Sequence, residues 1–168
     1  STKQGKWEKS NFNGTEINGK YLGLIGCGNI GSIVASRALG LKMKVLAFDP
    51  FLTKEKASEL GVEKVNFDYL LSNSDIISLH TPLTEDTKNI ISSEAISKMK
   101  KGSRIINCAR GGLVDEVACR AALETGHLAG AAFDVFSEEP AKENILFDAP
   151  NFVATPHLGA ATIEAQEN

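Results

Sequence analysis

Short apolar runs that alternate with segments of helical spacing constrain the fold of this chain more than any other feature. This alternation is typical of repeated β-α-β units, which place parallel strands in one sheet. It predicts a doubly wound, three-layer α/β/α fold of the Rossmann type, in which ligands bind at the carboxyl ends of the strands. The runs expected to form strands are residues 21–25, 44–48, 62–65, 76–79, 104–107, 128–133 and 152–154.

Helices are expected between these strands, with polar residues and glycines marking their ends. Gly61 is a natural helix C-cap, and Ser92 or Ser93 is available as an N-cap. The expected helical segments are residues 29–41, 53–60, 68–71 (a brief turn), 92–99 and 115–125. The first of these should present one largely apolar face, made by Ile30, Ile33, Val34, Arg37 and Ala38.

The organisation and charge of the chain narrow its class. We expect a connecting arm over residues 1–19, a nucleotide-binding domain over 20–160, and the start of a segment that returns to a second domain over 161–168. The net charge is −3 without a basic run, which argues against nucleic-acid and membrane partners. The three cysteines form no CxxC pair and are odd in number, so we expect a reducing, cytoplasmic setting. We expect no metal site.

A GxGxxG motif follows the first expected strand and opens the first expected helix. Gly26 permits a tight turn, Gly28 lets the backbone approach a pyrophosphate, and Gly31 allows close helix packing. The helix that begins around Asn29 and Ile30 offers unpaired N–H groups to phosphates. Taken alone, this glycine pattern also fits an ordinary strand-to-helix turn.

Asp49 strengthens the nucleotide interpretation. It ends the second expected strand, where an acid can accept hydrogen bonds from the adenine ribose and repel a 2′-phosphate. This position favours NAD over NADP. The alternative is that Asp49 and Pro50 form a simple turn.

Three later segments each follow an apolar strand and bring together the groups needed to oxidise a hydroxy acid. They supply Arg110, a carboxylate within residues 134–140, and His157. Arginine can hold a substrate carboxylate through two hydrogen bonds, and histidine can take the hydroxyl proton while a carboxylate orients it. Each residue alone has a structural alternative: a packed histidine, a surface ion pair or a solvated loop.

At these segments the chain resembles the D-isomer-specific 2-hydroxyacid dehydrogenase family, from Gly5 onward. The resemblance implies that Arg110 binds substrate, Glu139 orients the catalytic histidine, and His157 is the general acid/base. Asp134 would hold the nicotinamide carboxamide. Further residues implied to contact NAD are Thr81, Pro82, Cys108, Ala109, Gly159 and Ala160.

The resemblance further implies NAD-dependent oxidation of a D-2-hydroxy acid by an enzyme that forms a homodimer or a higher homo-oligomer. Glycerate, lactate and formate enzymes share the three catalytic residues, so the substrate stays open. Because relatives complete the cleft with a second domain, we expect this chain to turn over substrate poorly. The alternatives are an NAD(H)-sensing corepressor module and another NAD enzyme with the same fold, such as a homocysteine hydrolase relative.

Overall fold

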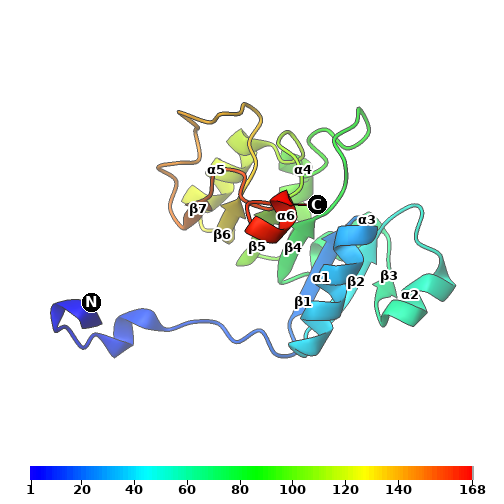
Figure 1. Cartoon of the computed structure of the whole chain (residues 1–168), viewed down its shortest axis with the longest axis horizontal. Helices are drawn as coiled ribbons and strands as arrows, with labels where there is room; N and C mark the ends of the chain where they lie inside the picture. Colours follow the sequence, from blue (N-terminus) through cyan, green and yellow to red (C-terminus); the bar gives the residue numbers. More distant parts are fainter. Residues whose placement is uncertain (168) are drawn as a thin grey trace.

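One sheet of seven parallel strands organises the structure (Figure 1), a computed structural model that describes residues 1–167. The strand order is β3-β2-β1-β4-β5-β6-β7, so the direction of winding reverses between β1 and β4. This arrangement confirms the predicted doubly wound fold. The strands are β1 (Tyr21–Ile25), β2 (Lys44–Phe48), β3 (Glu63–Lys64), β4 (Ile76–Leu79), β5 (Ser103–Asn107), β6 (Leu128–Phe133) and β7 (Phe152–Ala154).

Helices cover both faces of the sheet. Helices α1 and α2 pack over β1 to β3 on one face, and α3, α4 and α5 pack on the other. The short helix α6 follows β7. The helices are α1 (Asn29–Gly40), α2 (Lys54–Leu60), α3 (Phe67–Asn73), α4 (Ser93–Lys98), α5 (Glu116–Glu124) and α6 (Ile163–Gln166), preceded by the 3-10 turns η1 (Thr2–Gln4) and η2 (Lys9–Phe12).

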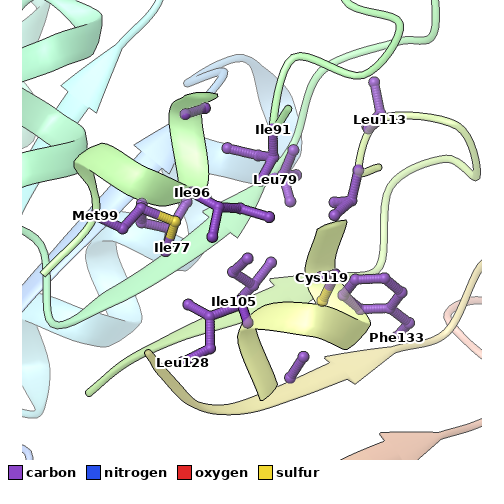
Figure 2. Packing of buried hydrophobic residues seen from close by; sticks show 14 of the residues in the cluster. Ile77, Leu79, Ile91, Ile96, Met99, Ile105, Leu113, Cys119, Leu128 and Phe133 are labelled. Atoms are coloured by element: carbon purple, nitrogen blue, oxygen red, sulfur yellow. The ribbon is translucent and has the colours of Figure 1, made fainter. Parts of the chain in front are cut away.

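The larger hydrophobic cluster lies between the sheet and helices α3 to α5 (Figure 2). Ile77 and Leu79 from β4, Ile105 from β5 and Leu128 from β6 are at most 1% exposed. Burying each such side chain contributes about 1.5–3 kcal/mol to folding. The central strands are therefore held rigidly, and their carboxyl ends are fixed relative to one another.

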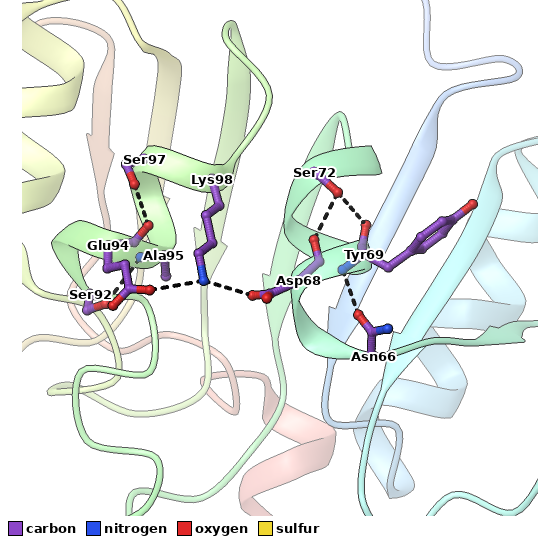
Figure 3. Close-up of polar contacts among 9 residues, drawn as sticks. All are labelled: Asn66, Asp68, Tyr69, Ser72, Ser92, Glu94, Ala95, Ser97 and Lys98. Atoms are coloured by element: carbon purple, nitrogen blue, oxygen red, sulfur yellow. Dashed lines mark hydrogen bonds and ion pairs between the residues drawn. The ribbon is translucent and has the colours of Figure 1, made fainter.

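Local polar contacts define the ends of α3 and α4 (Figure 3). The Asn66 side chain accepts a hydrogen bond from the Tyr69 N–H at 2.8 Å, and Ser92 caps α4 through the Ala95 N–H at 3.2 Å. Lys98 bridges the two helices, with its Nζ 3.1 Å from Asp68 and 3.0 Å from Glu94. Of the two serines considered for the cap of α4, Ser92 takes the role.

The predicted apolar face of α1 was only partly right: Ala38 is buried and Val34 packs against the core, but the isoleucines do not lie on the buried face. Ile30 and Ile33 are 64% and 53% exposed, and the residues that face the sheet are Gly31, Ala35 and Ala38. Small side chains take this position because the helix lies close to the strands. Large side chains at these positions would push α1 away from the glycine turn.

Two short elements also differ from prediction. The third strand pairs over only two residues, Glu63–Lys64, where 62–65 was expected. The brief turn expected at 68–71 is a seven-residue helix, Phe67–Asn73, because the Asn66 cap starts it earlier than the apolar pattern indicated.

Residues 1–19 form an arm that reaches away from the sheet (Figure 1). Every residue in it is exposed, and Trp7 is the most conspicuous at 84% exposure. The last part of the arm is tied to the body where the Gly19 N–H donates to the Lys42 carbonyl at 2.9 Å. No helix within residues 1–167 has the length and apolar character needed to cross a membrane.

Ser103, at the start of β5, offers a test of the core. Its hydroxyl is buried and has no hydrogen-bond partner among residues 1–167. Because an unpaired buried hydroxyl is destabilising, we expect Ser103→Ala to keep the free energy of unfolding unchanged or raise it by up to about 1 kcal/mol. Urea unfolding would measure the change.

A matched control is Ser78→Ala. The Ser78 hydroxyl is also buried, but it bonds to Nε2 of His80 at 2.9 Å. This variant should lower the free energy of unfolding by about 1 kcal/mol, because it leaves the ring nitrogen of the half-buried His80 without its partner. Equal losses in the two variants would contradict our interpretation of Ser103.

Candidate active site

The glycine turn joins the end of β1 to the start of α1. Gly26 has φ = +89°, and a Cβ there would lie 2.5 Å from the carbonyl oxygen of His80, so the turn requires glycine. A Cβ on Gly31 would lie 2.4 Å from the carbonyl oxygen of Gly26. At Gly28, by contrast, no heavy atom of residues 1–167 other than those of its immediate chain neighbours lies within 4 Å of the Cβ position. This open space, beside the first N–H groups of a twelve-residue helix, fits the pyrophosphate of a dinucleotide.

Asp49 lies at the end of the neighbouring strand and is bonded to the glycine turn. Its Oδ2 accepts from the Cys27 N–H at 2.7 Å, and its Oδ1 accepts from the Phe51 N–H at 2.8 Å. Each carboxylate oxygen has two acceptor positions, so both can still receive a ribose hydroxyl. The carboxylate is thus oriented next to the turn, as a ribose-binding acid needs to be.

Asn107 is a residue of the site that sequence reasoning missed. It is 1% exposed at the end of β5, its Nδ2 donates to the Arg110 carbonyl at 3.0 Å, and its Oδ1 accepts from the Ala109 N–H at 3.1 Å. These bonds shape the loop that carries Arg110. A polar residue that ends an apolar strand is the signal that could have identified it.

Arg110 itself is exposed above this loop. Its guanidinium donates to the Ala109 carbonyl at 2.6 Å and forms no ion pair within residues 1–167. An unpaired guanidinium with a fixed backbone can bind a carboxylate through two hydrogen bonds. The geometry therefore suits the substrate-binding role proposed from the sequence.

The loop of Arg110 lies directly against the loop that follows β6. A Cβ on Gly111 would lie only 1.7 Å from the carbonyl oxygen of Phe136, so the two backbones touch. The contact is possible because Gly111 has no side chain. It couples the position of Arg110 to that of the segment carrying Asp134 and Glu139.

His157 and Glu139 form the central pair of the site. The His157 Nδ1 lies 2.7 Å from Oε2 of Glu139, and Oε1 of Glu139 accepts from the Phe136 N–H at 3.0 Å. The bond with His157 and then the Phe136 N–H lower the pKa of Glu139, so it is ionised at neutral pH. With Nδ1 engaged, Nε2 remains for a substrate proton. The His157 side chain is 53% exposed, which leaves it accessible.

A pocket of about 530 Å³ lies beside this pair. Phe136 and Phe147 form one wall, with their rings packed edge to face and their centroids 5.4 Å apart. Asp134, Glu139 and His157 supply its titratable groups. Titratable groups in a largely apolar recess are typical of a ligand-binding site.

The remaining candidate residues also follow strand ends at the same edge of the sheet. Thr81 and Pro82 come after β4, and Cys108 and Ala109 come after β5. Burial, and then the charge of Asp134, raise the pKa of the Cys108 thiol, which therefore stays protonated at neutral pH. Gly159 and Ala160 lie in the exposed loop after β7.

The other two histidines have partners of their own. Burial lowers the pKa of His80, whose ring bonds to Ser78, and the Nε2 of His127 donates to the Ile96 carbonyl at 2.8 Å. In the part of the chain that the structure describes, no group of three or more His, Cys, Asp or Glu side chains could hold a metal ion.

Known proteins that are similar to this chain include nucleotide-binding dehydrogenases. The family model described as D-isomer specific 2-hydroxyacid dehydrogenase, NAD binding domain, matches residues 1–159. Over 168 residues the chain is 52% identical to D-3-phosphoglycerate dehydrogenase of Bacillus subtilis, covering all of this chain and 32% of that protein. The chain thus spans about a third of the length of this curated relative.

Two solved structures share the fold. One is a D-isomer specific 2-hydroxyacid dehydrogenase from Lactobacillus delbrueckii ssp. bulgaricus in its NAD complexed form, with a TM-score of 0.83 and 38% identity over 95% of this chain and 52% of that chain. The other is an acyclic imino acid reductase in complex with NADPH and D-Arg, with a TM-score of 0.88 and 34% identity over 99% of this chain and 52% of that chain.

Proposed function

Because this chain belongs to the D-isomer specific 2-hydroxyacid dehydrogenase, NAD binding domain family, we propose that it binds NAD(H) and provides the acid–base half of a hydroxyacid dehydrogenase. The observation that carries this proposal is the 2.7 Å contact between His157 and Glu139, at the edge of the sheet where the glycine turn and Asp49 also lie. The proposed cofactor site and the proposed proton acceptor therefore lie at the carboxyl ends of the same set of strands.

The residues present fit the cofactor. The open space at Gly28 would receive the pyrophosphate, and Asp49 would accept the ribose hydroxyls. Bound NAD supplies the acceptor for the hydride that leaves C2 of the substrate. These cofactor contacts do not use Arg110, Glu139 or His157, which remain available to the substrate.

The protein's own residues handle the substrate carboxylate and the proton. Arg110 binds the carboxylate, and Nε2 of His157 accepts the hydroxyl proton as C2 is oxidised to a carbonyl. Glu139 holds Nδ1 and stabilises the imidazolium that forms. Since Glu139 is ionised at neutral pH, it can balance this charge throughout the reaction.

For the substrate, we propose 3-phosphoglycerate, which would be oxidised to 3-phosphohydroxypyruvate in the first step of L-serine biosynthesis. The 52% identity with the Bacillus subtilis enzyme supports this choice over glycerate, lactate or formate. Product formation by a longer protein that contains this chain, measured as NADH absorbance with each acid in turn, would test it. A preference for another acid would refute the substrate and leave the cofactor site intact.

The cofactor proposal is tested on the chain itself. The NADPH complex of a protein with this fold shows that the fold alone does not select the cofactor. We expect saturable NADH binding, followed by nucleotide fluorescence, and NADPH binding at least about tenfold weaker because Asp49 repels the 2′-phosphate.

Asp49→Asn should narrow this preference by about tenfold, since the amide keeps the shape of the side chain but removes the charge. Asp68→Asn removes a carboxylate from α3, on the opposite face of the sheet from α1, and should leave the preference unchanged. Equal affinity of the wild-type chain for NADH and NADPH would contradict the assignment of Asp49.

A further inference from the structure

The loop that carries His157 has almost no packing to hold it. All residues from Val153 to Gln166 are exposed, and the loop lies between the end of β7 at Ala154 and the start of α6 at Ile163. Burial of apolar surface therefore cannot fix the position of the imidazole. Some other interaction has to do so if His157 is to meet Glu139.

A single buried carboxylate binds this loop at three points. Asp134, 5% exposed after the end of β6, accepts from the Thr155 hydroxyl at 2.5 Å and the Leu158 N–H at 2.7 Å through Oδ1. Its Oδ2 accepts from the Gly159 N–H at 2.9 Å. The three donors lie on both sides of His157 in the sequence, so the carboxylate holds the loop before and after the histidine.

Asp134 is itself anchored in the sheet. Its N–H donates to the Asn107 carbonyl at 2.9 Å, and Asn107 is the buried residue that shapes the Arg110 loop. The carboxylate is thus fixed to the rigid β5–β6 core. A loop bonded to it inherits that position.

The backbone at His157 requires this support. Its φ is +56°, a left-handed conformation that costs a non-glycine residue roughly 1–2 kcal/mol. Such conformations persist when the surrounding contacts over-determine them. The bonds to Thr155, Leu158 and Gly159 supply those contacts.

The charge of Asp134 makes the three bonds stronger. Burial by itself would raise the pKa of Asp134, but the bonds from Thr155, Leu158 and Gly159 outweigh burial and lower it. The group is ionised at neutral pH, and hydrogen bonds to an ionised acceptor are roughly twice as strong as neutral ones.

We propose that Asp134 is a positioning residue for His157: its carboxylate holds residues 155–159 so that the imidazole meets Glu139. The importance of this positioning role for catalysis rests on the proposed function of His157. The role is separate from the nicotinamide contact expected for Asp134, because one acceptor position of Oδ2 stays free for an external donor.

Asp134→Asn tests this proposal by NMR on the chain without nucleotide. The amide has the same shape, but its NH2 group cannot accept from the Gly159 N–H, and the charge is lost. We expect solvent exchange of the Leu158 and Gly159 amide protons to accelerate by about tenfold or more. The His157 Nδ1–H signal, which reports the bond to Glu139, should weaken or disappear.

Asp148→Asn is the matched control, because Asp148 is an exposed carboxylate bound to Arg120. It should alter neither readout. Unchanged exchange and an unchanged His157 signal in folded Asp134→Asn would overturn the proposal.

If Asp134→Asn does not fold, as shown by loss of the dispersed NMR signals of the core, the same two measurements are made on Thr155→Val. This variant removes one bond to Asp134 and keeps the carboxylate. Faster exchange at Leu158 and Gly159 with a weaker His157 signal would support the proposal, and wild-type behaviour would overturn it. Since no nucleotide is present, failure of NAD binding in a separate titration would refute the proposed function without affecting this result.

Discussion

Replacing Gly111 by alanine is expected to lower the free energy of unfolding by about 3 kcal/mol or more. The added Cβ would lie 1.7 Å from the Phe136 carbonyl oxygen and 2.1 Å from its carbonyl carbon. Both are backbone atoms, so no side-chain rotation can relieve the overlap. The two loops would have to separate, and with them Arg110 and the segment of Glu139.

Urea unfolding of Gly111→Ala would measure this loss, with Gly40→Ala as its control. Gly40 is the last residue of α1, and outside its chain neighbours and the backbone of α1 no heavy atom within residues 1–167 approaches its Cβ position within 4 Å. Alanine in a helix is favoured over glycine, so this control should be neutral or stabilising by up to about 1 kcal/mol. A Gly111→Ala protein as stable as the wild type would show that the two loops are not in contact.

The second large effect is expected on cofactor binding. Gly28→Ala should weaken NADH binding by about tenfold to a hundredfold, because a methyl group would occupy the space where the backbone approaches the pyrophosphate. The same change should leave stability almost unaltered, since the Cβ position of Gly28 is open and its φ is −74°. NADH fluorescence and urea unfolding on one preparation would measure the two quantities.

Gly26→Ala is the contrasting variant for this experiment. A Cβ on Gly26 meets the His80 carbonyl, so Gly26→Ala should damage the fold and the site together. Loss of binding with intact stability is therefore a signature of Gly28. NADH affinity that is unchanged in Gly28→Ala would mean that the pyrophosphate does not lie over this turn.

Much of the fold could be predicted from local sequence. The bounds of β1, β2, β4, β6 and β7 match the prediction because buried parallel strands are short apolar runs bounded by polar or turn residues. The caps Thr53, Ser92 and Asp115 lie where helices were expected to begin, and Gly61 ends α2 with φ = +73°. Each of these signals involves neighbouring residues only.

The error at α1 has a tertiary cause. Ile30 and Ile33 have the spacing of a buried face, yet α1 turns Gly31, Ala35 and Ala38 toward the sheet. Helical spacing predicts that an apolar face exists, but it does not predict how close the helix lies to the sheet. That distance depends on β1 and the glycine turn, and small side chains take the most buried positions while Val34 and Leu39 pack at the margin.

The parallel α/β fold and the set of chemical groups at its strand ends follow from local sequence, because apolar runs, caps and turns are read from adjacent residues. The way those groups are held depends on tertiary contacts. Three contacts join different strand ends or loops: Gly111 against Phe136, the Asp134 N–H bonded to the Asn107 carbonyl, and the bonds that Asp134 accepts on both sides of His157. Such contacts depend on distances across the sheet, which exist only once the strands have paired.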